Sequence, residues 1–222
     1  MLPALAHIRT WIFDLDNTLY PASCDLFGLV DVRMGAFIQD LLGVDAAEAR
    51  RIQKDHFLKH GTTLSGLMAE HGIDPHAFLA YVHDIEMDVL VEDRRLADAI
   101  ARLPGRKLIF TNGDRDYAGR VLARLGLSGS FEAIHDIHAC AYRPKPHPES
   151  YRAMLDALDV EPGTALFADD MARNLKPAKD LGLATVWVDN GSEQGGHDPA
   201  WIDHHVADLG EWLHDITQRD DA

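Results

Sequence analysis

The sequence predicts an α/β protein with a doubly wound parallel sheet and an inserted α-helical domain. Short apolar runs recur with helical stretches between them, which is typical of parallel strands buried on both faces. One interval, from Pro21 to about Leu103, contains helical patterns and no such run. We therefore expect a sheet that is interrupted, after its first strand, by a block of helices.

Five apolar runs are expected to be strands. They are TWIF (10–13), KLIF (107–110), FEAIH (131–135), TALFA (164–168) and ATVWV (184–188). Helices are expected between the later runs at Arg115–Leu125, Pro148–Leu158 and Ala172–Leu181, because each ends near a glycine or a turn cluster. The segment GSEQGGHDP (191–199) indicates a loop, and Trp201–Ile216 is expected to add a last short strand and helix.

The inserted block is expected to consist of successive helices. They are Cys24–Leu42, Ala46–His60, Leu64–His71 and Pro75–Leu90, and Arg94–Leu103 then leads back to the sheet. Asp45 and Asp74 precede two of these helices as capping residues, and Gly43 and Gly72 end two of them. We assign residues 1–20 and 96–222 to the core, and residues 21–95 to the inserted domain.

Charge and composition exclude several classes of partner. Lys and Arg number 21 against 36 Asp and Glu, which gives a formal charge of −15. This charge repels nucleic acid phosphates and anionic membrane surfaces, so neither is expected as a partner. No apolar run approaches the roughly 18 residues of a spanning helix, and the first residues lack a secretory pattern. We expect a cytoplasmic protein, as a monomer or homodimer, with two isolated cysteines as thiols.

Polar signals follow four of the expected strands. They are Asp14-Leu15-Asp16-Asn17-Thr18, Thr111-Asn112-Gly113, Arg143-Pro144-Lys145-Pro146 and Asp169-Asp170. In doubly wound sheets, ligands bind outside the carboxyl ends of the strands, at the point where strand order reverses. If the first strand lies between the second and the fourth, these four groups converge on one site.

Such convergence would bring four carboxylates together, which requires a compensating charge. At an effective dielectric near 20, one pair of like charges 4 Å apart costs roughly 4 kcal/mol. Mg²⁺ prefers carboxylate and carbonyl oxygens and commonly completes its coordination with a substrate phosphate. We therefore expect Mg²⁺ as cofactor and a small phosphorylated metabolite as substrate.

The neighbouring residues suit the recognition of a phosphate. Thr111 offers a hydroxyl, Asn112 and Gly113 offer backbone N–H groups, and Lys145 offers a positive charge. A carboxylate beside such a group can attack phosphorus and form an aspartyl-phosphate. Asp14 is the expected nucleophile.

The motifs DLDNT, TNG, KP and ADD, in this order, resemble the four motifs of the haloacid dehalogenase superfamily of phosphohydrolases. The resemblance implies a Rossmann-like core, with Asp14 as nucleophile and Asp16 as general acid and base. It also implies that Mg²⁺ is held by Asp14, Asp170 and the backbone carbonyl of Asp16, with Asp169 as a ligand or as a partner of the ligands. Asn174 resembles the residue that orients metal-bound water, and Thr18 is expected to support the turn after the first strand.

The inserted helices resemble the C1 cap of that superfamily, which closes over the site and selects the leaving group. FDLDNTLY, IFTNGD, RVLARLGL and FADDMARN are most similar to the pyrimidine 5′-nucleotidase group. This similarity implies a nucleoside 5′-monophosphate, such as UMP or CMP, as substrate. The candidate specificity residues in the cap are Arg33, His60, Thr62 and Thr63.

Several alternatives stay open. The same motifs would serve a phosphatase or a mutase acting on sugar phosphates, and the fold could also serve as a regulatory binding module without turnover. A carbon–halogen dehalogenase is disfavoured, because it is not expected to carry an acid at the position of Asp16. His56 and His60 have the spacing of two ligands on one helix face, but without a third ligand or an HExxH pattern a solvated face is expected.

Overall fold

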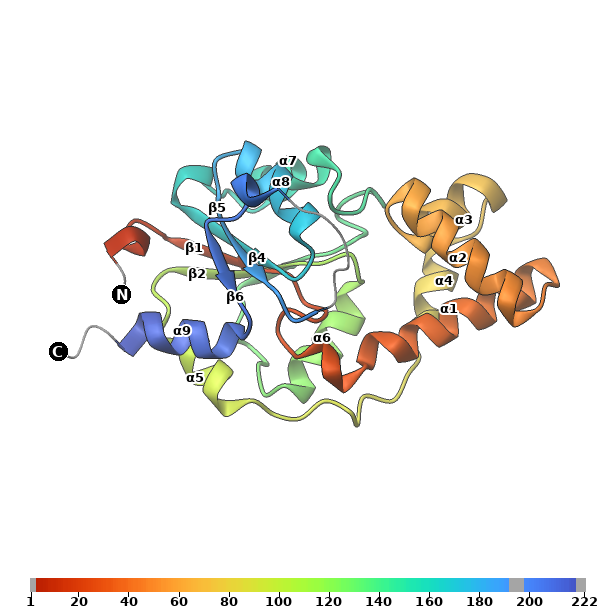
Figure 1. Ribbon diagram of the computed structural model, residues 1–222, viewed down its shortest axis with the longest axis horizontal. Helices are drawn as coiled ribbons and strands as arrows, with labels where there is room; N and C mark the ends of the chain where they lie inside the picture. The colour runs from red at the N-terminus through yellow and green to blue at the C-terminus, as the bar shows by residue number, and fades with distance from the viewer. Residues whose placement is uncertain (1–2, 192–197, 219–222) are drawn as a thin grey trace.

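The computed structural model describes residues 3–191 and 198–218, and its centre is a parallel sheet of six strands (Figure 1). The strand order is β3-β2-β1-β4-β5-β6. The strands are β1 (Thr10–Phe13), β2 (Arg106–Phe110), β3 (Ala133–His135), β4 (Ala165–Asp169), β5 (Ala184–Val188) and β6 (His204–Val206). The predicted doubly wound α/β fold is confirmed, with β1 between β2 and β4.

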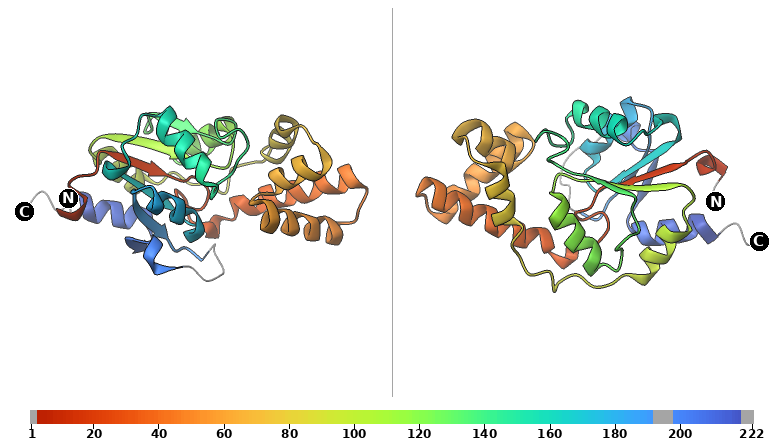
Figure 2. Two further views of the ribbon diagram at one scale, coloured as in Figure 1. Left: turned by 90° about the horizontal axis from the view of Figure 1, so that it is seen from above. Right: turned by 180° about the vertical axis from the view of Figure 1, so that it is seen from behind.

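Two layers of helices cover the two faces of the sheet. On one face lie α7 (Pro148–Ala157) and α8 (Ala172–Asp180), and on the other lie α5 (Arg94–Arg102), α6 (Arg115–Arg124) and α9 (Leu209–Gln218) (Figures 1 and 2). Successive side chains of a strand point to opposite faces, so both faces need apolar residues. In β1, Ile12 packs in the cluster under α7 and α8, while Phe13 packs in the cluster under α6.

Four helices form a group beyond the carboxyl ends of the strands. They are α1 (Leu26–Leu42), α2 (Ala46–His60), α3 (Thr63–His71) and α4 (Pro75–Val82). Figure 1 shows this group beside the sheet, at the end where β1 leads into α1. The side-chain oxygens of Asp45, Thr62 and Asp74 accept hydrogen bonds from the first backbone N–H groups of α2, α3 and α4, which satisfies donors that a helix start leaves open. None of the described helices, here or in the core, is both long and apolar enough to cross a membrane.

Some predicted boundaries are wrong, and each has a local cause. The helix predicted over 75–90 ends at Val82, because Arg120 of α6 binds the next segment by donating to the carbonyl oxygens of His83 and Ile85 at 2.9 and 2.6 Å. The helix predicted from Cys24 begins at Leu26, since Asp25 takes a left-handed conformation with φ of 56°. The predicted strand 131–135 pairs only over 133–135. Most of the predicted loop at 191–199 lies outside the described residues.

Candidate active site

The carboxyl end of β1 brings the four sequence signals together. Phe13 is paired with Ile109 of β2 and with Ala168 of β4, and the N–H of Asp14 donates to the carbonyl oxygen of Ala168 at 2.9 Å. The residues that follow the three strands therefore share one corner. This corner is the reversal point of the strand order, where ligands bind in doubly wound sheets.

A buried lysine connects two of the aspartates. The Nζ of Lys145 lies 2.7 Å from Oδ1 of Asp14 and 2.7 Å from Oδ2 of Asp169, and the lysine is 1% exposed. Burial opposes the positive charge, but the two carboxylates outweigh burial and raise the pKa of Lys145 above its ordinary value. The ammonium thus offsets much of the repulsion between the two acids. Asn112 positions this loop, since its Oδ1 accepts from the N–H of Lys145 at 2.8 Å.

Asp169 is engaged by protein donors on both oxygens. Its Oδ1 accepts from the N–H of Met171 at 2.8 Å and from Nδ2 of Asn174 at 2.9 Å, and its Oδ2 accepts from Lys145 and from Asn174 at 3.1 Å. Oδ1 of Asn174 is buried and has no hydrogen-bond partner among the described residues. A buried acceptor of this kind costs free energy unless it is satisfied, so a water molecule or ligand donor is expected beside it.

Thr18 joins the first and the last of the four signals. Its hydroxyl donates to Oδ2 of Asp14 at 2.9 Å and accepts from the N–H of Asp170 at 3.0 Å. One oxygen each from Asp14, Asp169 and Asp170 lie within 4.8 Å of one another, and all three residues are buried. The donor set of carboxylate oxygens fits a hard divalent cation such as Mg²⁺.

Two tyrosines hold Asp16, and the sequence reasoning missed both. Oδ1 of Asp16 accepts from the hydroxyl of Tyr20 at 2.6 Å and from the hydroxyl of Tyr117 at 2.7 Å. Burial raises the pKa of Asp16 and the neighbouring Asp14 adds to this rise, whereas the two tyrosine hydrogen bonds oppose it. Tyr20 follows the first motif directly, but Tyr117 is separated from Asp16 by 101 positions, so only the fold brings it there.

Tyr117 is itself supported by the helical group. The ring of His83, at the end of α4, stacks on the Tyr117 ring with centroids 4.1 Å apart, and His83 Nδ1 lies 2.5 Å from Oδ2 of Asp114. Asp114 also caps α6, because its Oδ1 accepts from the N–H of Tyr117 at 2.8 Å. Tyr117 thus contacts both His83 of the helical group and Asp16 of the core, and links the two.

Replacing Tyr117 by phenylalanine is expected to slow phosphate release, for which the sequence predicts Asp16 as general acid and base, by roughly 10- to 150-fold, because one hydrogen bond to a charged group contributes about 1.5–3 kcal/mol. The lost bond favours the ionised carboxylate, so its removal should raise the pKa of Asp16 and move the pH–rate profile to higher pH. Measurement of kcat against pH checks both effects. Tyr81→Phe is the matched control, since it keeps the ring beneath Arg33 and should leave the profile unchanged; a Tyr117→Phe profile identical to that of the control would contradict the prediction.

The expected phosphate-binding residues differ in how they reach the site. Asn112, Gly113 and Lys145 line the cavity at the strand ends, whereas Thr111 is 1% exposed and does not line it. The hydroxyl of Thr111 accepts from the N–H of Gly113 at 3.0 Å. This N–H group, expected from the sequence to bind phosphate, is therefore already engaged within the loop.

The cavity between the sheet and the helical group has a volume of about 610 Å³. Asp14, Asp16 and Asp170 lie in its wall, and the opposite wall is largely apolar. That wall is formed by Phe27, Val30, Met34, Phe57, Phe78 and Val82. Polar and charged side chains of the helical group and of α8 also line it, among them Asp31, Arg50, Gln53, Lys54 and Arg173.

Two of the four cap residues predicted to face the site do not line this cavity. Arg33 donates from Nε and Nη2 to the carbonyl oxygen of Tyr81 at 3.0 and 2.8 Å, and its guanidinium lies over the Tyr81 ring. His60 turns toward Glu70, with 3.0 Å between Nε2 and Oε1. The expectation for both is corrected, because each is held by a neighbouring helix. Thr62 and Thr63 do line the cavity.

Comparison with known proteins gives one family. The sequence model of the haloacid dehalogenase-like hydrolase family matches residues 8–182 of this chain. Phosphate metabolism protein 8 of Saccharomyces cerevisiae is 28% identical over 198 residues, which cover 80% of this chain and 60% of that protein. The glyceraldehyde 3-phosphate phosphatase of Methanocaldococcus jannaschii is 25% identical, with 95% of this chain and 97% of that protein covered. This chain thus spans less than two thirds of the yeast relative.

Solved structures of two kinds share the fold. The HAD phosphatase from Thermococcus onnurineus aligns with a TM-score of 0.62 at 17% identity, covering 96% of this chain and 98% of that one. The L-2-haloacid dehalogenase from Xanthobacter autotrophicus aligns with a TM-score of 0.57 at 20% identity, covering 97% of this chain and 100% of that one. At such identities the likeness concerns the fold alone.

Proposed function

Because the chain belongs to the haloacid dehalogenase-like hydrolase family, we propose that it is a Mg²⁺-dependent phosphomonoesterase that forms an aspartyl-phosphate on Asp14. The observation that carries this proposal is Asp16, which lies in the same cavity wall as Asp14 and is held there by Tyr20 and Tyr117. An alkoxide leaving group needs a proton, which a carboxyl with a raised pKa can donate. A halide leaving group needs no proton, so the first step of a dehalogenase would not use a carboxyl acid at this position.

We assign the metal to Asp14, Asp170 and the backbone carbonyl of Asp16. Asp169 accepts four hydrogen bonds, from Lys145, Met171 and twice from Asn174, which suits a residue that positions Lys145 and Asn174. When bound, Mg²⁺ would neutralise negative charge on the phosphoryl oxygens. Oδ1 of Asn174, buried beside Asp169 without a described partner, is the acceptor that would orient a water molecule near the metal.

The reaction proceeds in two displacements at phosphorus. In the first, a carboxylate oxygen of Asp14 forms a bond to phosphorus while the bond to the ester oxygen breaks, and Asp16 gives its proton to the departing alkoxide. In the second, ionised Asp16 takes a proton from water, whose oxygen attacks phosphorus as the bond to Asp14 breaks. Inorganic phosphate leaves, and both aspartates return to their starting states.

Lys145 contributes by position and charge throughout these steps. Its ammonium is fixed between Asp14 and Asp169 at 2.7 Å from each, so it can stabilise negative charge on the phosphoryl group without reorganisation. Its fixed position also orients Asp14 for attack. Most catalysis of phosphoryl transfer consists of such positioning and electrostatic stabilisation.

For the substrate we propose a nucleoside 5′-monophosphate, selected by a cap formed by residues 21–95. The cavity of about 610 Å³ falls within the range of small-molecule sites, and its exposed aromatic side chains Phe27 and Phe57 are suited to contact a base. Arg50 and Lys54 line the same cavity and carry positive charge. A sugar phosphate is the alternative, since the Methanocaldococcus relative is a phosphatase of a three-carbon phosphate.

Release of inorganic phosphate from a panel of monoesters tests the proposal. The panel contains p-nitrophenyl phosphate, UMP, CMP, hexose phosphates and glyceraldehyde 3-phosphate, each with Mg²⁺ and with EDTA. We expect Mg²⁺-dependent release that EDTA abolishes, with the highest kcat/KM for the nucleotides. Release of chloride from L-2-chloropropionate instead would overturn the phosphatase, isomer formation from a hexose phosphate would indicate a mutase, and no turnover at all would indicate a binding module.

A further inference from the structure

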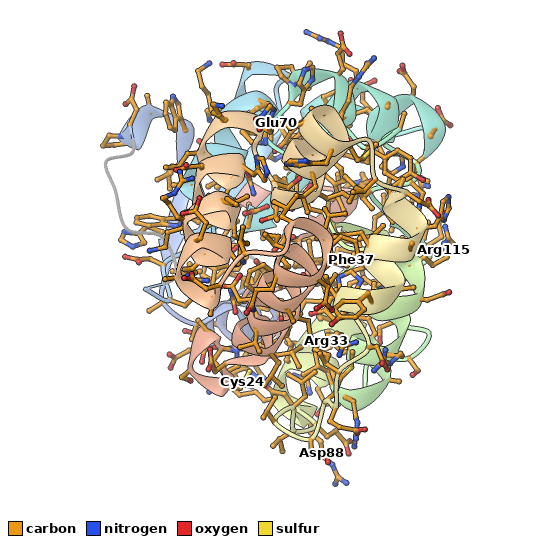
Figure 3. All side chains as sticks on the ribbon, turned by 90° about the vertical axis from the view of Figure 1, so that its right-hand side faces the viewer. Cys24, Arg33, Phe37, Glu70, Asp88 and Arg115 are labelled. Atoms are coloured by element: carbon orange, nitrogen blue, oxygen red, sulfur yellow. The ribbon has the colours of Figure 1, made fainter. Side chains whose placement is uncertain are left out.

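A histidine pair in the helical group has surroundings that the phosphatase reaction does not explain. His56 and His60 lie one turn apart on α2, and α3 packs against them with Glu70 (Figure 3 labels Glu70). His56 is 3% exposed, and neither of its ring nitrogens has a hydrogen-bond partner among the described residues. The prediction that this helix face is solvated is therefore wrong for His56. Glu70 of α3 provides a possible third metal ligand, which α2 itself does not contain.

The ligand atoms of these three residues converge. Nε2 of His60 lies 3.0 Å from Oε1 of Glu70, and Nδ1 of His56 lies 3.8 Å from the same oxygen. One ligand atom from each residue lies within 4.8 Å of the other two. Ligands placed tetrahedrally about 2.0–2.1 Å from Zn²⁺ are about 3.3 Å apart, so only small side-chain shifts separate this arrangement from a bound state.

We propose that His56, His60 and Glu70 bind a divalent transition-metal ion, with Zn²⁺ as the favoured ion, at a site separate from the aspartate cluster. Two imidazoles and one carboxylate suit Zn²⁺, whereas Mg²⁺ prefers oxygen ligands alone. A water molecule, or His71, whose ring centroid lies 6.0 Å from that of His56, completes the coordination.

The packing around His56 supports a built site. A polar group buried without a partner costs free energy, and a coordinate bond to a metal would remove that cost. A Cβ at position 66 would come within 2.3 Å of the His56 ring, so Gly66 allows α3 to approach the ring closely. Burial also lowers the pKa of His56, which favours the neutral imidazole that binds metals.

One neighbouring cation has to move when the metal binds. Nζ of Lys59 lies 3.4 Å from Oε1 of Glu70, but its side chain is 68% exposed and can turn into water. The metal would join the end of α2 to Glu70 of α3. Gly61 and Thr62, which connect these two helices, line the large cavity. We therefore assign the metal a structural role, which is to hold this helical hairpin and the cavity wall that its loop provides.

Metal titration of the metal-free protein tests the proposal, with saturating Mg²⁺ present to occupy the aspartate cluster. We expect one equivalent of Zn²⁺ to bind and to raise the Tm, and Co²⁺ to give the intense visible bands of a low-coordinate site. His60→Gln and Glu70→Gln, at partly exposed positions, should each weaken binding at least tenfold and abolish the Co²⁺ bands. Lys59→Gln is the control and should bind as well or better.

Three results would overturn the proposed metal site. If the unaltered protein shows no low-coordinate Co²⁺ bands, the site does not exist, and this result does not depend on the folding of any variant. Unchanged Zn²⁺ affinity in both ligand variants, or loss of binding in Asp170→Asn instead, would also overturn the proposal. None of these measurements requires phosphatase activity, so the proposed function and the metal site can fail independently.

Discussion

Asp14→Asn is expected to abolish phosphate release, with a loss in kcat on the order of 10⁴-fold or more, because an amide oxygen is a far weaker nucleophile than a carboxylate. The substitution is nearly isosteric, and with its oxygen in the place of Oδ1 the amide can still accept from the Lys145 ammonium, while its NH2 group faces the Thr18 hydroxyl oxygen. The fold should therefore persist while the chemistry stops. Initial rates with p-nitrophenyl phosphate and Mg²⁺ measure the effect.

Asp40→Asn is the matched control, because Asp40 is an exposed acid on α1, outside the cavity lining. Its kcat and KM should equal those of the unaltered protein. Trapping of acid-stable phosphoprotein in single-turnover experiments adds a direct test, since label should appear on the unaltered protein and not on Asp14→Asn. Activity of Asp14→Asn within tenfold of the control would remove Asp14 as the nucleophile.

Lys145→Met is expected to destabilise the protein by about 3–5 kcal/mol, because it leaves two buried carboxylates without their shared cation. Methionine has a similar length and no charge, so the change removes the two 2.7 Å ion pairs with little change in volume. The free energy of unfolding in urea, measured in EDTA so that no divalent cation compensates, gives the cost directly. Phosphatase activity should also fall sharply, since the cation near the phosphoryl group is lost.

The matched control for this prediction is a surface lysine. Lys176 pairs with Asp180 one helical turn away, but the two side chains are 49% and 60% exposed. An exposed pair contributes at most about 1 kcal/mol, so Lys176→Met should change stability far less than Lys145→Met. Equal costs for the two variants would show that the buried ion pairs do not stabilise the site.

Much of the core could be predicted from the sequence, because its signals are local. Continuous apolar runs such as TWIF and ATVWV require burial on both faces, and this requirement alone implies a parallel sheet between helices. The convergence of Asp14, Asp169 and Asp170 could then be predicted, since these residues follow the carboxyl ends of parallel strands and those ends share one edge of the sheet. Helix starts at Asp45 and Asp74 were equally local.

The helical group was predicted less well, because its details depend on contacts between residues far apart in the chain. The helix expected to continue past Val82 stops where Arg120 binds the backbone. Arg33 was expected to face the substrate, but it is held over Tyr81 by hydrogen bonds and ring contact. A long side chain such as that of Arg33 can turn to either side of its helix, and the spacing of apolar residues in the sequence does not predict which neighbouring group it will bind.

Local sequence patterns were enough to predict the sheet, the order of its elements along the chain and the acids at the end of β1, because apolar patterning and turn chemistry act over a few residues. Three other features depend on the packing of whole elements: the set of donors that bind Asp169, the hydrogen bond from Tyr117 to Asp16 across 101 positions, and the approach of Glu70 to His56 and His60. These contacts join residues far apart in the chain or on different helices. Their geometry depends on how whole elements pack, which no local pattern contains.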